Sequence, residues 1–455
     1  IHTGAGDESF DFEEVIGGVT VDAGEGDEDD GGDTLTIAST TGAMTIDLSV
    51  VNGQQITVGT TGTWRNFENL DASAADDTLT VTASAGGSII LTGSANDFIT
   101  LGLGDDYVRA GNGDDTIIVG VGLNSGDDIG LGAGNDNFSY ATLATDVVID
   151  GEGDSDTIFY TGAGPLSVDL SNAADVISAE DGTYRNFESF NGFTANGAIT
   201  VISNAGASVL TGNGMDVVTL SAGAPEAVNT GANADIIHAT DLTFNDGDSV
   251  IGGSGIDTLS ITGGGTFNLT LASVTTIDII QTDDTGTELI LNNMNNLTVN
   301  TGTGNDSVTV GASGTQTVNT GDGADSVALV AGTGVNTINT GAGVDEVTGT
   351  LSGGDSIDLG GDDDSFEYTA TIDSGNIIDG NTGDDELVYS GGSALTINFF
   401  TTANNVTGEA GSYRNFEDLD ASAAGGVMTV TAAAGGSVIK TGSVGDTINL
   451  GAGTD

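Results

Sequence analysis

Three aspartates, Asp97, Asp106 and Asp115, follow one another at intervals of nine residues. Each stands two residues after a glycine or alanine and two residues before an isoleucine or valine, as in Gly-x-Gly-x-Asp-x-Val. Calcium prefers carboxylate and backbone carbonyl oxygens as ligands, and a glycine-rich turn supplies both because its backbone can curl. The pattern therefore predicts calcium binding in a series of tight turns.

The same frame recurs along the chain and defines the predicted calcium ligands. They are Asp97, Asp106, Asp115, Asp127, Asp136, Asp216, Asp235, Asp306, Asp325, Asp345, Asp364, Asp446 and Asp455. Thr315 and Asn336 stand where the frame expects aspartate, so we expect weak or empty sites there. A single aspartate in such a turn more often caps its own backbone; the constant spacing of successive aspartates favours metal binding.

Short strands must hold these turns in register. After many of the aspartates the chain alternates apolar and polar residues, as in DFITLG (97–102), DTLSI (257–261) and DSVTVG (306–311). Such alternation over four or five residues indicates a β-strand, and helical periodicity is nearly absent. A long chain of short strands with glycine turns at a fixed period predicts an all-β fold, a right-handed parallel β-solenoid of the β-roll or β-helix type.

A longer repeat lies over the short one. The segment GTWRNFENLDASAADDTLTVTASAGGS (62–88) has counterparts at 182–208 and 411–437, with a degenerate copy at 276–291. An aromatic strand precedes each clear copy: SFDF, NFSY and SFEY. We therefore expect one continuous solenoid over 1–455, a slice of a longer chain, with approximate modules 1–92, 93–210, 211–300 and 301–455. The insertions at 165–181 and 401–411 should project from its side.

Composition narrows the function. The chain has 68 acids against 5 Lys plus Arg, a formal charge of −63, which excludes nucleic-acid binding through a basic patch. The acids either bind divalent cations or form a solvated coat, and their fixed motif position favours cations. There is no cysteine and no apolar run long enough to span a membrane. A nucleophile motif and clustered bases are absent as well, so we expect no enzyme activity.

Three arginines, Arg65, Arg185 and Arg414, occupy the same place in the clear copies of the longer repeat. An active site is rarely built three times in one chain, so we expect each to pair with a nearby acid, Glu68, Glu188 or Glu417. The aromatic residue before each arginine (Trp64, Tyr184 or Tyr413) should pack over an edge of the solenoid rather than stack on a sugar.

The Gly-x-Gly-x-Asp turns resemble the repeats-in-toxin family, whose calcium-binding β-roll motif is Gly-Gly-x-Gly-x-Asp-x-U-x, where U is apolar. The resemblance is strongest over 93–139 and 211–364, although the first glycine is usually Thr, Leu or Ala here, as in TGTGNDSVTV (301–310). It implies secretion, a right-handed β-roll and folding that depends on calcium. The NFENL-type strand, alternating with such repeats, also resembles the long surface proteins and adhesins of bacteria.

These observations predict an extracellular, calcium-loaded structural or adhesive fibre of a bacterial surface protein. Its expected partners are calcium, further copies associating end to end or side by side, and a cell-surface or glycan target. Two alternatives are a surface-layer lattice protein and the secretion and folding tail of an exported enzyme.

Overall fold

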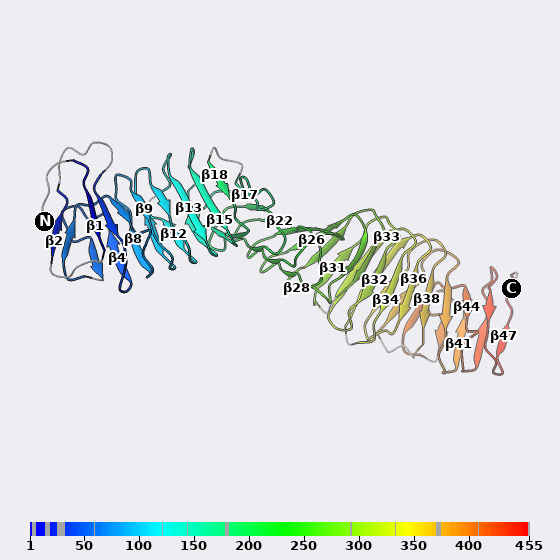
Figure 1. The fold of residues 1–455 in the computed structure, drawn as a ribbon. Helices are drawn as coiled ribbons and strands as arrows, with labels where there is room; N and C mark the ends of the chain where they lie inside the picture. The colour runs from blue at the N-terminus through cyan, green and yellow to red at the C-terminus, as the bar shows by residue number, and fades with distance from the viewer. Residues whose placement is uncertain are drawn as a thin grey trace. The chain divides into compact units, whose positions relative to one another are not determined.

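The chain folds as a long parallel β-solenoid of about 18 turns (Figure 1). This computed structural model describes residues 1, 6–13, 19–24, 32–58, 60–120, 122–142, 144–177, 182–291, 294–332, 334–369, 375–407 and 409–453. Within these ranges there is no helix, and so none long and apolar enough to cross a membrane. The predicted all-β parallel solenoid is thereby confirmed. The chain divides into two compact units, 1–219 with 226–232, and 220–225 with 233–455.

The first unit contains strands β1 to β23. Their bounds are β1 Ser9–Phe12, β2 Thr20–Asp22, β3 Thr34–Ile37, β4 Met44–Asp47, β5 Ile56–Val58, β6 Thr63–Arg65, β7 Asn69–Asp71, β8 Leu79–Thr82, β9 Ile89–Leu91, β10 Phe98–Leu101, β11 Tyr107–Arg109, β12 Thr116–Val119, β13 Asp128–Ala133, β14 Asn137–Tyr140, β15 Val148–Gly153, β16 Thr157–Tyr160, β17 Leu166–Asp169, β18 Thr183–Arg185, β19 Ser189–Asn191, β20 Ile199–Ile202, β21 Ser208–Leu210, β22 Val217–Thr219 and β23 Ala227–Asn229. Over most of this unit, successive strands alternate between two parallel sheets, so one turn of the solenoid uses two strands.

The second unit contains strands β24 to β47 and repeats this plan. Their bounds are β24 Ile236–Thr240, β25 Ser249–Ile251, β26 Thr258–Thr262, β27 Gly265–Asn268, β28 Ser273–Thr275, β29 Ile279–Thr282, β30 Thr287–Ile290, β31 Leu297–Asn300, β32 Ser307–Val310, β33 Gln316–Asp322, β34 Ser326–Leu329, β35 Thr337–Ala342, β36 Glu346–Gly349, β37 Ser356–Asp358, β38 Ser365–Tyr368, β39 Ile377–Asp379, β40 Glu386–Tyr389, β41 Leu395–Asn398, β42 Val406–Thr407, β43 Ser412–Arg414, β44 Asp418–Asp420, β45 Met428–Thr431, β46 Ile439–Lys440 and β47 Thr447–Asn449.

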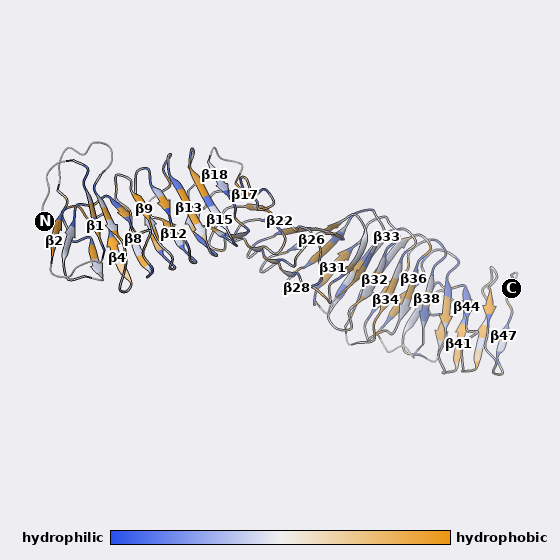
Figure 2. Cartoon of the chain, viewed as in Figure 1, coloured by the Kyte–Doolittle hydropathy of each residue, from blue (hydrophilic) through white to orange (hydrophobic). Residues whose placement is uncertain are grey.

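The core follows from the alternation within each strand. In β10, β12, β14 and β16 the residues Ile99, Ile117, Phe138 and Ile158 lie opposite one another in register and are fully buried. Their neighbours point outward and are mostly threonine, serine or asparagine, so apolar and polar positions alternate along the strands (Figure 2). Identical positions therefore stack from turn to turn, as a period of two within each strand requires.

Each unit changes its pair of sheets at two places. In the first unit one sheet ends at β6 and another at β18, while new sheets begin beside them at β4 and β17. In the second unit sheets end at β28 and β43, and new ones begin with β27 and β41. The ending strands carry the Trp64, Tyr184, Val274 and Tyr413 positions of the longer repeat. Each copy of that repeat thus lies where one sheet of the solenoid ends and another begins. The predicted module boundaries remain a prediction.

The sequence predicts that the insertions project from the side of the solenoid. In the structure they fold back onto it. In the 165–181 segment the N–H of Asp169 donates to Val176 O at 2.8 Å, and that of Val176 donates to Tyr184 O at 2.6 Å. The 401–411 segment repeats this arrangement through Asn405, which links Asn398 to Tyr413 at 2.7 Å on each side. Both segments fold back because they bring an apolar residue, Ile177 or Val406, into the core.

Candidate cation-binding turns

The predicted aspartates lie in the turns just before strands, and most of their side chains point inward. Eleven of them are buried, with at most 3% of their surface exposed, and Asp446 is half-buried. Asp455 lies outside the described residues. Because a buried carboxylate is costly unless its oxygens find partners, the surroundings of these side chains decide what the turns do.

In the second unit the aspartates form a continuous ladder along the solenoid. The Oδ1 atom of Asp325 accepts a hydrogen bond from the backbone N–H of Asp306, one turn before, at 2.8 Å. The same 2.8 Å bond joins Asp345 to Asp325 and Asp364 to Asp345. Each carboxylate therefore caps the backbone of its counterpart in the preceding turn, not its own as an isolated turn aspartate would.

A second ladder runs through the first unit. Asp97 accepts from Leu79 N–H at 2.7 Å, Asp115 from Asp97 N–H at 2.7 Å, and Asp136 from Asp115 N–H at 2.6 Å. On another edge of the same unit, Asp127 accepts from Asp106 N–H at 2.8 Å. The nine-residue spacing thus places alternate aspartates on different edges.

Several ladder members were missed by sequence reasoning. Asp156, Asp257 and Asp385 occupy the same buried positions, and each accepts the N–H of the preceding ladder aspartate. For Asp257 a clear signal was present, because GGSGIDTLS (252–260) contains every position of the Gly-Gly-x-Gly-x-Asp motif. Four residues before Asp156 and Asp385, where the frame has glycine, the chain has Glu152 and Asn381.

Asparagine takes the ladder position without a charge. Asn336 Oδ1 accepts from Gln316 N–H at 3.2 Å, and Asn336 N–H donates to Asp355 at 2.6 Å. Thr315 was predicted to stand at the ladder position of the preceding turn, but it is exposed, and its neighbour Gln316 is buried there instead. The predicted position was therefore one residue too early. In this turn the glycine that stands two residues before the ladder position is Gly314, which places Gln316 in the ladder.

The second oxygen of most ladder carboxylates is buried without a hydrogen bond. Within the described residues such an oxygen occurs in Asp97, Asp106, Asp115, Asp136, Asp156, Asp257, Asp306, Asp325, Asp345, Asp364 and Asp385. A buried polar atom without a partner is rare in folded proteins, so these oxygens require an explanation. The repetition of this feature at equivalent positions makes it a property of the fold.

Burial raises the pKa of many ladder carboxyls, because the charged form loses its hydration. Repulsion from neighbouring ladder carboxylates adds to the increase, and the backbone N–H donors partly offset it. The pKa reaches about 8 in Asp115 and Asp156, about 7 in Asp106, Asp364 and Asp385, and about 6 in Asp136. Burial in the turns therefore favours the protonated form of these carboxyls well above the pH at which a free aspartate ionises.

The turns require glycine because the backbones of neighbouring turns approach each other closely. A Cβ added to Gly341, which has φ of +105°, would lie 1.9 Å from the carbonyl oxygen of Gly321 in the preceding turn. Gly321 and Gly360 show the same 1.9 Å approach to Gly302 and Gly341. Backbone carbonyls therefore stack along this edge, close to the buried aspartates that follow each glycine by four residues.

Threonine replaces the first glycine of the resembling motif and forms a ladder of its own. The buried hydroxyls of Thr301, Thr320 and Thr340 donate to the backbone carbonyls of Thr320, Thr340 and Leu359 at 2.9, 2.9 and 2.6 Å. Each bond joins one turn to the next. This position therefore contributes cohesion between turns through its side chain.

The arginines of the longer repeat do not pair with the predicted glutamates. Arg65 and Arg185 instead contact Asp22 and Asp150, with N–O distances of 2.6 and 2.7 Å. The parallel register explains this difference, since it sets each arginine directly opposite that aspartate in the preceding turn. Arg414 lies opposite Asp379 in the same way, 4.0 Å from its carboxylate.

The glutamates close the aspartate ladders. Glu68, Glu188 and Glu417 accept the backbone N–H of Asp33, Asp156 and Asp385 at 2.9, 2.8 and 3.3 Å. In the degenerate copy Asp278 does the same for Asp257, at 3.0 Å. Each copy of the longer repeat thus supplies the acid that ends a ladder where the pair of sheets changes.

The aromatic residues of the longer repeat are inside the core, contrary to the expectation of an edge position. Trp64, Tyr184 and Tyr413 are fully buried. Each packs on an aromatic ring of an earlier strand: Phe12, Tyr140 and Tyr368, with ring centroids 4.6, 5.7 and 5.6 Å apart. The inward position follows from strand alternation, since the arginine after each of them points outward.

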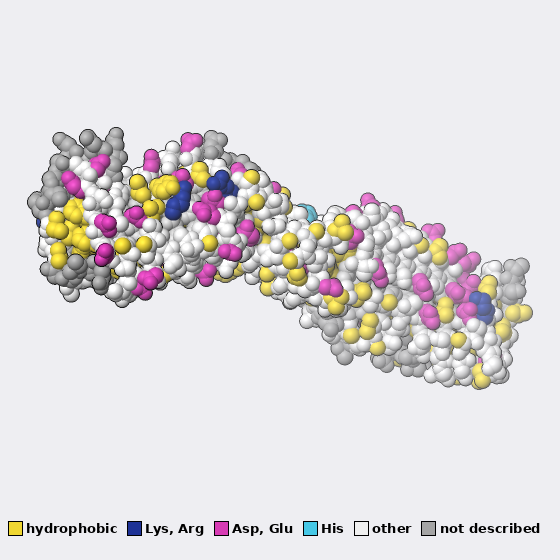
Figure 3. Space-filling model, in the orientation of Figure 1, with side chains coloured by type: hydrophobic (Ala, Val, Ile, Leu, Met, Phe, Trp, Pro, Cys, Tyr) yellow, Lys and Arg dark blue, Asp and Glu magenta, His cyan; other side chains and the backbone are white. Residues whose placement is uncertain are grey.

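The donor atoms of these turns suit a hard cation. Within the described ranges no group of three or more His, Cys, Asp or Glu side chains converges, so any cation would be held by one or two carboxylates together with backbone carbonyls. The unbonded aspartate oxygens and the stacked glycine carbonyls supply only oxygen, which calcium prefers over softer ligands. Acidic side chains also far outnumber basic ones on the visible surface (Figure 3), so cations would be attracted generally.

Without divalent cations, the stability of the folded chain should fall as the pH rises. The unfolded carboxyls titrate near 3.8, and the folded ones near 6 to 8. A raised folded pKa contributes stability that is complete below the unfolded value and is lost as the pH rises through the folded value. In EDTA, thermal unfolding followed by circular dichroism should therefore shift down by several degrees between pH 5 and pH 8. An unchanged or rising midpoint would contradict the buried, uncompensated carboxyls.

The described turns and sheets define the class of the molecule as a parallel β-solenoid repeat protein. No known family model matches the chain, and no curated protein is significantly similar to it.

Proposed function

We propose that the chain is a segment of an extracellular structural or adhesive fibre of a bacterial surface protein, and that its turns bind calcium. The observation that carries this proposal is the ladder of buried aspartates, each with one oxygen bonded to backbone and one without a partner. The resemblance of the turns to the repeats-in-toxin family supports calcium as the ion and a right-handed β-roll as the form of the solenoid.

Bound calcium would place positive charge at the turns and would be coordinated there by oxygen ligands. The residues that would hold it are the ladder aspartates, including the predicted set and the additional Asp156, Asp257 and Asp385, together with carbonyls of the turn glycines. Without cations, the formal charge of −63 opposes compaction, so the folded state would be least stable before export. Neutralisation outside the cell would then couple cation binding to the stacking of turns.

A solenoid of stacked turns suits mechanical or spacing tasks better than catalysis. The described ladders use their carboxylates to bond backbone, and the five basic residues of the chain include three arginines that pair with aspartates one turn away. We therefore propose a non-enzymatic role, with further copies of the fibre and a cell-surface or glycan target as partners.

Thermal unfolding in the presence of different cations tests the proposal. At pH 7.5 and low salt, calcium in the millimolar range should raise the unfolding midpoint of the chelated protein by about 10 °C or more, since binding to the folded state alone adds free energy that grows with ligand concentration. Magnesium should give a much smaller shift, because it prefers smaller octahedral sites that retain water. Equal midpoints in EDTA and calcium would reject the function.

A further inference from the structure

One sheet of the second unit has an outward surface without a carboxylate, lysine or arginine. It is formed by β24, β26, β29, β31, β33 and β35, which pair in this order. Their outward side chains are exposed or half-buried and stand in two columns in register, which we call the neutral face. One column is Ile236, Thr258, Ile279, Thr298, Thr317 and Thr337, and the other is His238, Ser260, Gln281, Asn300, Asn319 and Asn339.

Composition alone does not explain the neutral face, because the chain has 68 acids among its 455 residues. On the other long sheet of this unit, acids point outward from several strands: Glu288, Glu346, Glu367, Glu386 and Asp418. The turns that lead into β31, β33 and β35 share the lack of charge. The sequence has no acidic or basic residue in 289–305, 307–321 or 326–344.

The side chains of the neutral face are held in place before any partner arrives. The amide of Asn319 donates to Asn300 Oδ1 at 2.9 Å, and that of Asn339 donates to Asn319 Oδ1 at 2.7 Å. The other column consists of isoleucine and threonine, whose β-branched side chains have few accessible rotamers. Covering such a surface therefore costs little side-chain entropy.

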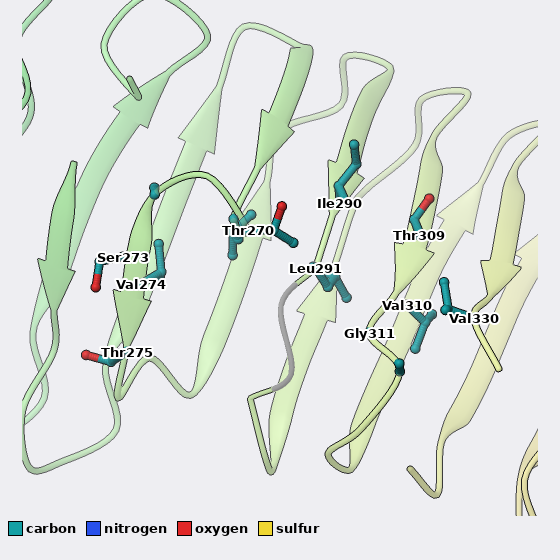
Figure 4. A pocket seen from close by; sticks show the side chains of 13 residues that line it. Thr270, Ser273, Val274, Thr275, Ile290, Leu291, Thr309, Val310, Gly311 and Val330 are labelled. Carbon is teal, nitrogen blue, oxygen red and sulfur yellow. The ribbon is translucent and has the colours of Figure 1, made fainter. Parts of the chain in front are cut away.

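The uncharged surface continues from the neutral face into an apolar groove (Figure 4). The groove encloses about 580 Å³, and no charged residue lines it. Leu291, Val310 and Val330 line it where the chain leaves β30, β32 and β34 for the turns before β31, β33 and β35. In the last of these turns Val330 and Val335 are exposed, at 47% and 43%. The neutral face therefore has an apolar border.

We propose that the neutral face binds the same face of a second copy of the chain. This inference rests on the proposed function, since it assigns the surface through which copies of the fibre associate side by side. Two chains with a formal charge of −63 repel each other, and this repulsion is least where the facing surfaces carry no charge. A second copy also repeats its side chains at the same interval of about 4.8 Å, so that the columns of both copies interdigitate.

The size of the neutral face sets the expected strength of the contact. From β24 to β35 it spans roughly 25 Å at a strand spacing of about 4.8 Å. Such a patch is smaller than the interface of a stable dimer, which buries about 800 Å² on each partner. We therefore expect weak pairing of single segments, which gains strength when many segments of a fibre pair at once.

Sedimentation equilibrium of the whole chain in calcium-containing buffer tests the proposal. We expect a reversible dimer with a Kd between about 10 µM and 1 mM, as for a contact below the standard interface size. Raising sodium chloride from about 50 to about 500 mM should tighten the dimer several-fold, because salt screens the repulsion between two acidic copies. A chain that stays monomeric at millimolar concentration in high salt would overturn the proposal.

Matched variants locate the contact. Thr317 and Ala328 are half-buried outward residues on the successive strands β33 and β34, and their neighbours on adjacent strands are uncharged. Thr317→Glu should weaken the dimer by about tenfold or more, because it brings like charges together in the contact, whereas Ala328→Glu should not weaken it. Gln281→Glu, an isosteric change at an exposed position of the neutral face, should weaken it several-fold. Equal dimerisation of Thr317→Glu, Gln281→Glu and Ala328→Glu would overturn the proposal.

Two further readouts separate this proposal from that of calcium binding. Circular dichroism establishes that each variant is folded, and the shift of the unfolding midpoint by calcium reports the cation sites. A chain that calcium stabilises but that remains monomeric overturns the pairing of neutral faces alone. A dimer that Thr317→Glu disrupts, in a chain whose midpoint calcium does not shift, supports the pairing and rejects the cation sites.

Discussion

Asp364→Asn should stabilise the chelated protein at pH 8 and yet reduce the stabilisation that calcium gives. The carboxyl of Asp364 is buried, has a pKa of about 7 and has one oxygen without a hydrogen bond. Asparagine keeps an oxygen to accept the N–H of Asp345, as Asn336 does for Gln316, and it carries no charge. It also lacks the carboxylate that a cation would bind.

The measurement is the thermal midpoint in EDTA and in calcium for wild type and variant. We expect the difference between the two conditions to shrink by an amount equivalent to about 1–3 kcal/mol, the typical value of a hydrogen bond or ligand contact to a charged group. Asp322→Asn, at an exposed position in the same part of the solenoid, serves as the control and should leave the difference intact. An Asp364→Asn protein with the full response to calcium would show that this carboxylate binds no cation.

Gly341→Ala should destabilise the protein more than any exposed substitution, by about 3 kcal/mol or more. A left-handed backbone costs an L-residue about 1–2 kcal/mol, and an added methyl group in a packed site costs about 1–3 kcal/mol more. The new Cβ would meet the backbone oxygen of Gly321 at 1.9 Å, and that oxygen cannot move without shifting a whole turn.

Two other glycines separate these contributions. Gly263 has a positive φ of 93° but open space around its Cβ position, so Gly263→Ala should show the backbone strain alone. Gly392 has neither a positive φ nor a close neighbour, so Gly392→Ala should be neutral. Urea unfolding measures all three free energies. A Gly341→Ala protein as stable as Gly392→Ala would contradict the close stacking of the turns.

The fold could be predicted from sequence because period and alternation repeat so often. Asp306, Asp325, Asp345 and Asp364 recur every 19 or 20 residues, and each precedes a strand with inward Val or Phe. The predicted strands at 97–102, 257–261 and 306–311 appear as β10, β26 and β32 with small shifts of their ends. Local pattern is sufficient for this, since every turn contacts chiefly its neighbours.

Partners across turns could not be predicted, because they depend on register. The aspartate opposite Arg185 is Asp150, which lies 35 residues earlier, and no local pattern indicates that separation. For the same reason, the sequence did not predict the hydrogen bond from Asp156 N–H to Glu188 or the packing of Tyr184 on Tyr140. Parallel pairing across an insertion sets these contacts, and the length of the insertion does not reveal the register.

Anomalous X-ray diffraction from crystals grown with calcium, or with terbium in its place, tests the central claim most directly. We predict peaks beside the unbonded carboxylate oxygens of Asp325, Asp345 and Asp364, repeated from turn to turn. A folded solenoid without anomalous peaks at these oxygens, at neutral pH and millimolar calcium, would contradict it. The buried aspartates would then be protonated structural groups that bond backbone only.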